Sequence, residues 1–304
     1  MRLASLDLGT NSLLVTVADW DGASLVSVFE NALLVRLGEH LRPGGKLDRA
    51  ARSRCFHALE SIREIIAGYD VDQVVAVATE AIRTASDGPS FIEVIRNRLG
   101  FPFRILTPGE EARLTFKATQ KEFAHVKTGL VIFDIGGGST EIVAGDALTV
   151  SRVIPLDFGT VSLTERFIRH DPIAPEEMDR ALRWVQSRLT PLSPGPSPCT
   201  AVGTGGTVTT LKAVSLKMEP YDPPAIHRST LTRTEVKGLL DLFMSMTVIQ
   251  RTKLPGLPAR RADIIPAGAA ITGEIMDRLK LTAITVSDRG LRWGVLYDWI
   301  EKNG

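Results

Sequence analysis

The start of the chain alternates short, mainly apolar runs with compact polar turns. Residues 3–8 and 12–18 are two such runs, separated by a glycine-containing turn. A second turn signal follows at Asp19–Ala23. Apolar runs bounded by Gly, Asn and Asp are typical of strands joined by tight turns. Residues 1–28 are therefore predicted to form a strand, a turn and a strand, as a hairpin or meander.

Apolar residues follow helical spacing across residues 47–69, which predicts an amphipathic helix. After it, residues 71–87 read as a buried strand that leads through a loop into a short helix. A helix from residue 90 is expected to end at Gly100, and residues 102–107 read as a strand. Strands followed by alternating strands and helices indicate a mixed sheet flanked by helices.

A second round of the same pattern follows a helix predicted at residues 110–123. Its predicted elements are strands at 129–136, 140–146 and 151–157, a helix at 175–189, a stiff proline-rich loop at 190–200, a strand-like segment at 200–207, and a strand, glycine turn and terminal helix within 282–303. Both rounds open with strand, loop and strand. The sequence therefore predicts an α/β protein with two related lobes and a cleft between them.

Composition narrows the class of protein. The chain has 304 residues, 44% of them hydrophobic, and a formal net charge of +1, which does not suggest a nucleic-acid binder. Its two cysteines have no metal-type spacing and read as reduced thiols. No leader-like segment and no apolar run of about 18 residues is present. We therefore expect a cytoplasmic protein with neither nucleic-acid nor membrane partners.

An aspartate-bearing turn occurs twice, as DLGTNS from Asp7 and as DIGGGST from Asp134. Glycines let a ligand approach the backbone, and successive N–H groups form an anion-binding concavity. An aspartate cannot itself favour phosphate, but it can hold a hard divalent cation beside it. The candidate phosphate-binding residues are Thr10, Asn11 and Ser12 in the first turn and Gly136, Gly137, Gly138 and Ser139 in the second.

A third glycine-rich stretch, AVGTGGTVTTL, begins at Ala201 and contains Gly205. Neither the P-loop pattern nor G-x-G-x-x-G fits any of the three stretches. Taken alone, DLGTNS could be a plain hairpin turn. Three consecutive glycines would weaken a strand pair unless a ligand comes close, so the three stretches together favour phosphate binding.

Eight segments in order resemble the exopolyphosphatase and guanosine pentaphosphate phosphohydrolase (Ppx/GppA) family, within the superfamily of actin, hexokinase and the heat-shock chaperone ATPases. They are DLGTNS, VRLGEHL, VATEAIRTASD, GEEARL, DIGGGSTE, DFGTVSLTERF, GTGGT and VSDRGLRWGVL. The resemblance covers nearly the whole chain. It implies two ribonuclease-H-like lobes around a phosphate-binding cleft. It places lobe one at residues 1–116 with 290–304, and lobe two, with the second loop and the GTGGT stretch, at 117–289.

The resemblance also implies roles for acidic residues. Glu111 corresponds to the catalytic base that activates the attacking water. Asp134 and Glu141 correspond to acidic residues at the magnesium ion, or another divalent cation, and at that water, and Asp7 joins them as a metal ligand. Without the resemblance, Glu110 and Glu111 could merely complement the dipole at a helix N-terminus.

Arginines supply the remaining implied contacts. Arg83 corresponds to an arginine on the phosphate chain, and Arg36 and Arg261 are further candidate contacts. The guanidinium fork suits phosphate because it can donate two hydrogen bonds at once. Each arginine also has a plainer interpretation. Arg83 could be a solvated helix residue, Arg36 a surface charge on a strand, and Arg261 part of a basic surface turn. The five histidines show no ligand spacing and receive no role.

The resemblance implies a hydrolase that releases terminal phosphate from inorganic polyphosphate, or the 5′ γ-phosphate of guanosine pentaphosphate, and a homodimer. A kinase or ATPase of the same superfamily, or a catalytically silent sensor, are the alternatives. Longer family members continue into a helical C-terminal region that this sequence does not contain, so shorter substrates are expected. Leu14 stands where many relatives carry a polar or basic residue, so one substrate contact is expected to be missing.

Overall fold

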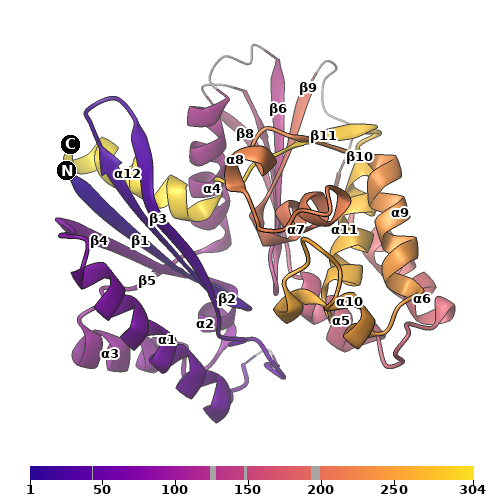
Figure 1. Cartoon of the computed structure of the whole chain (residues 1–304), viewed down its shortest axis with the longest axis horizontal. Coiled ribbons are helices and arrows are strands. Elements are labelled where there is room, and N and C mark those ends of the chain that lie inside the picture. Colours follow the sequence, from indigo (N-terminus) through magenta and orange to yellow (C-terminus); the bar gives the residue numbers. More distant parts are fainter. Residues whose placement is uncertain (43, 124–127, 147–148, 193–198) are drawn as a thin grey trace. The chain divides into compact units, whose positions relative to one another are not determined.

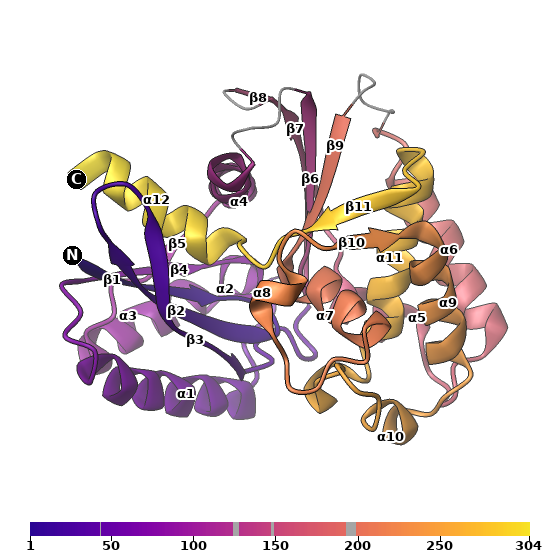
Figure 2. The same cartoon turned by 45° about the horizontal axis from the view of Figure 1, so that its top comes forward.

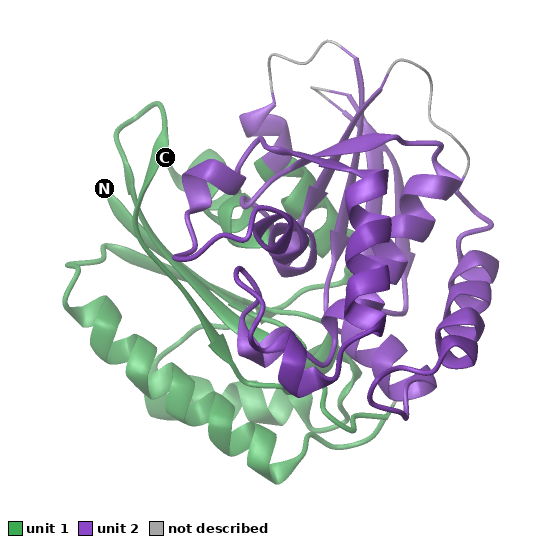
Figure 3. Cartoon of the chain, turned by 45° about the vertical axis from the view of Figure 1, so that its right-hand side comes forward, with its two compact units in different colours: residues 1–118, 291–304 green, residues 119–290 purple. Residues whose placement is uncertain are grey.

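The computed structural model describes residues 1–42, 44–123, 128–146, 149–192 and 199–304. These residues form two compact units, which Figure 3 shows in different colours. Unit 1 comprises residues 1–118 and 291–304, and unit 2 comprises residues 119–290. Most of the predicted proline-rich loop lies outside the described residues. Within those residues, no helix is both long and apolar enough to cross a bilayer.

Unit 1 contains one five-stranded sheet, and Figures 1 and 2 label its elements. The strands are β1 (Arg2–Leu8), β2 (Ser12–Trp20), β3 (Leu25–Leu34), β4 (Gln73–Ala78) and β5 (Arg104–Ile105). The helices are α1 (Arg49–Ala67), α2 (Glu80–Thr84), α3 (Gly88–Leu99), α4 (Pro108–Glu122), whose last turn belongs to unit 2, and α12 (Leu291–Asn303).

Unit 2 contains a six-stranded sheet. Its strands are β6 (Gly129–Ile135), β7 (Thr140–Gly145), β8 (Val150–Leu156), β9 (Cys199–Thr204), β10 (Thr230–Thr232) and β11 (Ala283–Val286). Its helices are α5 (Thr160–Phe167), α6 (Pro175–Arg188), α7 (Gly205–Ser215), α8 (Pro223–Ile226), α9 (Arg233–Met244), α10 (Val248–Arg251), the 3-10 helix η1 (Ala259–Arg261) and α11 (Ile265–Arg278).

The two sheets share one topology. Their strand orders are β3-β2-β1-β4-β5 and, read from the other edge, β8-β7-β6-β9-β11-β10. In each, three antiparallel strands in chain order are followed by two strands parallel to the first one. The unit 2 sheet adds β10, which is antiparallel to β11. This arrangement confirms the predicted α/β class with two related lobes.

Side chains alternate between the two faces of the unit 1 sheet, as the period of a strand requires. Leu6 and Leu8 of β1 join the core formed with α1 and α3, whereas Leu3 packs with α12 on the opposite face. Figure 2 shows these helices on the two sides of the sheet. In unit 2, α11 contacts α5, α6, α7 and α9. Its buried residues surround much of its circumference, as expected of a central core helix.

Three element predictions need correction. The opening meander has a third strand, since β3 continues to Leu34. The strand predicted at residues 102–107 is reduced to the two residues of β5. The strand predicted at residues 200–207 ends at Thr204, and Gly205 begins α7. The predicted helix end at Gly100 is confirmed, because Gly100 adopts φ 78° as the cap of α3.

Gly294 of α12 packs directly on α4, because a Cβ there would lie 1.8 Å from the Leu114 carbonyl oxygen. We expect Gly294→Ala to destabilise unit 1 by about 1–3 kcal/mol, since overpacking forces the backbone to move. Gly238 of α9 is the matched control, because a Cβ there meets no atom within 4 Å. Gly238→Ala should be stabilising by about 0.5–1 kcal/mol. Chemical denaturation of both variants measures the difference, and equal stabilities would contradict the packing argument.

Candidate functional site

The first candidate phosphate loop is the turn between β1 and β2. Its closing hydrogen bond runs from the Gly9 N–H to the Ser12 carbonyl oxygen, at 3.0 Å. The backbone N–H groups of Val35 and Arg36 donate to Asn11 O at 3.1 and 2.9 Å. Asn11 Nδ2 and Ser12 Oγ are buried and have no hydrogen-bond partner among the described residues. Buried polar groups are normally paired, so these two atoms remain candidates for hydrogen bonds to a ligand.

Asp7 and Thr10 flank this loop and are both buried. Asp7 lies in register with Leu14 of β2. As an odd-numbered β1 residue, Asp7 points to the sheet face on which Leu3 packs against α12. The Thr10 carbonyl accepts a hydrogen bond from the Gly38 N–H at 3.0 Å. The segment that follows β3 therefore braces the loop through backbone bonds.

The second candidate phosphate loop, between β6 and β7, is built in the same way. Its closing hydrogen bond runs from the Gly136 N–H to the Ser139 carbonyl oxygen, also at 3.0 Å. The N–H groups of Thr160 and Val161, in the first turn of α5, donate to the Gly136 and Gly137 carbonyls at 2.9 and 2.8 Å. In both units, then, the segment after the third strand returns to hold the loop.

Two carboxylates stand side by side next to the second loop. Asp134 of β6 and Glu141 of β7 are directly opposite in the antiparallel ladder, so their side chains share a face. Glu141 is 4% exposed, and burial raises the pKa of the Asp134 carboxyl to about 6. In unit 1, Leu14 occupies the place opposite Asp7 that Glu141 occupies opposite Asp134. Unit 2 alone therefore has the two-carboxylate arrangement at this position.

This pair fits a hard divalent cation such as magnesium, which takes oxygen ligands and usually keeps several waters. Among the described residues, no three His, Cys, Asp or Glu side chains cluster closely enough to hold a metal ion by themselves. A cation on Asp134 and Glu141 would therefore complete its shell with water and phosphate oxygens.

The third glycine stretch is a helix N-terminus rather than a strand-to-strand turn. Gly205 begins α7 with φ 80°, a conformation that side chains rarely adopt, and a Cβ there would lie 2.1 Å from Asp134 Oδ1. The free N–H groups at a helix N-terminus attract anions. The sequence pattern predicted an anion site here, and the structure shows that this stretch is a helix end beside Asp134.

Arg261 lies over this helix end. A Cβ on Gly206 would lie 2.0 Å from Arg261 Nη2. Burial, together with the neighbouring charge of Arg260, lowers the pKa of Arg261 to about 10. No carboxylate forms an ion pair with Arg261 in the described part of the chain. A desolvated cation at a helix N-terminus gives the site a strongly positive character, which suits a phosphate group.

Glu111 and Arg83 form a pair within unit 1. Arg83 Nη1 lies 3.0 Å from Glu111 Oε2 and donates to the Leu106 carbonyl at 2.7 Å, while Arg83 Nη2 pairs with Glu80. Both side chains are largely buried. Arg83 is therefore a fixed guanidinium held by two carboxylates rather than a solvated helix charge. Glu80 was not among the residues that the sequence singled out.

The structure separates the roles of Glu110 and Glu111. Glu110 forms the capping box of α4, since its carboxylate accepts from the Thr107 N–H at 2.9 Å and its own N–H donates to Thr107 Oγ1 at 3.2 Å. Glu110 also pairs with Arg104. The helix-start interpretation thus applies to Glu110, and Glu111 takes no part in the cap.

The predicted site residues fall into two groups, one in each unit. Unit 1 holds Asp7, Thr10, Asn11, Ser12, Arg36, Arg83 and Glu111, and unit 2 holds Asp134, Gly136, Gly137, Gly138, Ser139, Glu141, Gly205 and Arg261. Within unit 1, Arg36 contributes its backbone N–H to the first loop, and its side chain lies 3.8 Å from Glu39. Within unit 2, Asp134 joins the second loop to the N-terminus of α7.

Comparison with known proteins decides the family. A model of the Ppx/GppA phosphatase family matches residues 16–303. The chain belongs to the Ppx/GppA phosphatase family. The resemblance found in the sequence motifs is thereby confirmed.

Related proteins agree with this assignment. Exopolyphosphatase 2 of Mycobacterium tuberculosis is 33% identical over 311 residues, which is 97% of each chain. The crystal structure of the Aquifex aeolicus Ppx/GppA family member is 33% identical, covers 100% of this chain and 99% of its own, and has a TM-score of 0.84. A bifunctional 3-dehydroquinate synthase/phosphatase of Fusobacterium nucleatum is 30% identical over 98% of this chain, which spans 46% of that relative.

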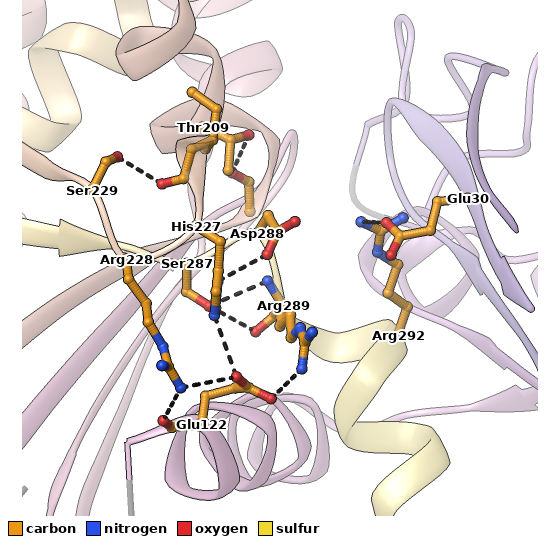
Figure 4. Close-up of polar contacts among 12 residues, drawn as sticks. Glu30, Glu122, Thr209, His227, Arg228, Ser229, Ser287, Asp288, Arg289 and Arg292 are labelled. Atoms are coloured by element: carbon orange, nitrogen blue, oxygen red, sulfur yellow. Dashed lines mark hydrogen bonds and ion pairs between the residues drawn. The ribbon is translucent and has the colours of Figure 1, made fainter. Parts of the chain in front are cut away.

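One charged cluster of this Ppx/GppA family member escaped the sequence analysis (Figure 4). His227 follows α8 and lies 3.3 Å from Glu122 Oε2, at the end of α4, and 2.9 Å from Asp288 Oδ1. Arg289 pairs with the same glutamate. The SDRG part of the last family motif was visible in the sequence, but no pattern linked it to a histidine far away along the chain.

The electrostatics of the cluster favour a charged imidazole. Burial by itself lowers the pKa of His227, but contact with Asp288 and Glu122 outweighs burial and raises it above 6.5. Burial likewise raises the pKa of Glu122, yet His227 and Arg289 bring it down to about 2. The cluster therefore ties the end of α4 to the segment just before α12, close to the two points where the chain passes between the units.

A pH-dependent stability is expected from His227. Because its folded pKa is raised, its contribution is fully present below pH 6.5 and is lost as the pH rises through the folded value. His227→Gln should therefore cost about 1–3 kcal/mol at pH 6 and progressively less at alkaline pH. Urea unfolding of both proteins from pH 6 to pH 9 measures the change, with exposed His170→Gln as the control. A pH-independent difference would exclude a charged His227.

Proposed function

We propose that this chain hydrolyses phosphoanhydrides, releasing terminal phosphate from inorganic polyphosphate or the 5′ γ-phosphate of guanosine pentaphosphate. The observation that carries the proposal is the repeated loop, closed by the same 3.0 Å backbone bond in both units, with a strand-end aspartate before it. A pair of such loops suits a chain of phosphates. The exopolyphosphatase named among the relatives supports this substrate class.

The proposed roles follow the chemistry of phosphoryl transfer, which needs positioning and charge neutralisation more than covalent catalysis. Glu111 would accept the proton of the attacking water, and Arg83 orients this carboxylate. Asp134 and Glu141 would hold Mg2+, which neutralises phosphate charge when bound. Arg261 and the N-terminus of α7 would bind phosphate oxygens. Asn11 and Ser12 would donate further hydrogen bonds.

A phosphate-release assay tests the proposal. Long polyphosphate, short polyphosphate, guanosine pentaphosphate and ATP are supplied separately, with Mg2+ and with chelator. We expect release from polyphosphate or guanosine pentaphosphate that depends on the cation, and little release from ATP. Preference for ATP, or transfer to a small acceptor, would instead favour a kinase or ATPase. Sedimentation analysis of the same preparation checks the expected homodimer.

A further inference from the structure

An unusual arginine cluster surrounds the C-terminal half of α6 in unit 2. Arg166 of α5 and Arg188 of α6 place their Cζ atoms 4.7 and 5.1 Å from the centre of the Trp184 ring. Arg180 lies one turn before Trp184 on the same helix face. Two further guanidiniums reach the end of α6: Arg152 donates to Pro191 O at 2.9 Å, and Arg278 donates to Thr190 O at 3.0 Å.

We call these five residues, Arg152, Arg166, Arg180, Arg188 and Arg278, the arginine patch. All five are exposed, and none forms an ion pair with a carboxylate among the described residues. The undescribed stretches contain no Asp or Glu. The chain as a whole carries a net charge of only +1. The patch is therefore a local concentration of arginines without a direct carboxylate partner in the described part of the chain.

Part of this arrangement has an ordinary explanation. Cations near a helix C-terminus are favoured by the helix dipole, which accounts for Arg188 and for the carbonyl contacts of Arg278. It also favours Arg166, which lies in the last turn of α5. It does not account for the stacking of Arg166 and Arg188 on Trp184. That indole also contacts Phe158 and Phe167, with ring centroids 5.1 and 5.7 Å away.

Stacking on an aromatic ring fixes the plane of a guanidinium while its N–H edge stays available. Less side-chain entropy is then lost when an anion binds. Proteins that bind single-stranded nucleic acids use aromatic rings to stack bases, but Trp184 already packs against two guanidiniums and two phenyl rings. The patch therefore suits a polyanion without bases.

The patch is also connected to the second phosphate loop. The first turn of α5 donates to the Gly137 carbonyl through the Val161 N–H at 2.8 Å. Arg166 lies five residues further along α5, or roughly 8 Å at the helical rise per residue. A phosphate chain must extend several units beyond the loop to cover this distance and reach Arg166.

We propose that the arginine patch is an auxiliary binding surface for the distal part of a long inorganic polyphosphate chain. This inference rests on the proposed function for its choice of polyanion. It assigns no catalytic role to the five arginines. They hold long chains near the second loop by ion pairing and by release of counterions, and short substrates do not reach them.

The test is the double variant Arg166→Gln/Arg188→Gln. We expect KM for polyphosphate of about 100 units to rise roughly tenfold, as for the loss of two exposed ion contacts. kcat should stay unchanged, and so should KM for tripolyphosphate. In a plot of log affinity against log salt concentration, the slope should become shallower by about two, one for each ion contact removed, by analogy with nucleic acids.

Arg63→Gln/Arg98→Gln in unit 1 is the matched control. It removes the same charge from exposed arginines, one of which also stacks on an aromatic ring, with Arg98 Cζ 5.7 Å from the Phe56 centroid. Equal effects of the two double variants would overturn the inference, because net charge alone would then explain the loss. An equal loss for long and short substrates would also overturn it.

Direct binding separates this inference from the proposed function. Fluorescently labelled long polyphosphate is titrated into the wild-type protein and both double variants, with thermal unfolding as a check on folding. Loss of affinity confined to Arg166→Gln/Arg188→Gln supports the patch even if no hydrolysis is detected. Tighter patch-dependent binding of a single-stranded oligonucleotide than of polyphosphate would overturn the choice of partner.

Discussion

Replacing Glu111 with Gln is expected to lower kcat for phosphate release by about 10²-fold or more, with little change in substrate affinity. The amide keeps the shape of the side chain but cannot accept the proton of the attacking water, and general-base contributions are of this size. It can still accept a hydrogen bond from Arg83 Nη1, which lies 3.0 Å from Glu111 Oε2. Steady-state kinetics of phosphate release measure the effect.

Glu110→Gln is the matched control, because it alters the neighbouring carboxylate. Glu110 caps α4 through Thr107 and pairs with Arg104, so its loss should reduce stability by about 0.5–1 kcal/mol and leave kcat nearly unchanged. If Glu111→Gln retained wild-type turnover, or if both variants lost activity equally, Glu111 could not be the base.

Replacing Asp134 with Asn is expected to remove activity and yet to stabilise the protein in the absence of divalent cations. Burial raises the pKa of the Asp134 carboxyl to about 6, so folding at pH 8 places an unfavourable charge in unit 2. A shift of about two units from the ordinary value corresponds to roughly 3 kcal/mol. The neutral amide avoids this cost. Thermal unfolding in chelator should therefore show a melting temperature several degrees above wild type at pH 8.

The size of this stabilisation depends on pH and on Mg2+ in a defined way. A group with a raised folded pKa is favoured in its neutral form, so the advantage of Asp134→Asn should shrink as the pH falls from about 6 to about 4. Mg2+ should raise the melting temperature of the wild type and leave that of the variant unchanged. Exposed Asp179→Asn is the control for charge alone. An equal response of wild type and Asp134→Asn to Mg2+ would remove Asp134 from the metal site.

Local patterns predicted both strand-loop-strand openings but no element between residues 208 and 281, where α9 and the central helix α11 lie. Turn residues and apolar runs predicted both strand–loop–strand openings, and Gly100 marked the end of α3. The GTGGT stretch stays a predicted anion site, and its conformation was missed, since a helix begins at Gly205. The local sequence of a strand followed by glycines has the same pattern whether the next element is a strand or a helix. In the structure a helix begins there, with Gly205 at φ 80° and no room for a Cβ beside Asp134.

In the candidate site, too, the sequence left the roles of single residues undecided and the structure distinguished them. Two adjacent glutamates, Glu110 and Glu111, have equal standing in the sequence, and only their partners distinguish a cap from a held carboxylate. His227 had no local signal at all. Its importance depends on Glu122 and Asp288, which are distant along the chain.

The sequence by itself determined many elements of unit 1 and of the start of unit 2, the repeated aspartate loops and the Ppx/GppA family, because strand periodicity, turn chemistry and motif order all depend on neighbouring residues. Only the tertiary structure decided which charges meet: Arg83 with Glu111, Glu122 with His227, and the arginines around Trp184. Electrostatic partners are chosen by distance in space and by loss of solvent, and neither can be read from separation along the chain.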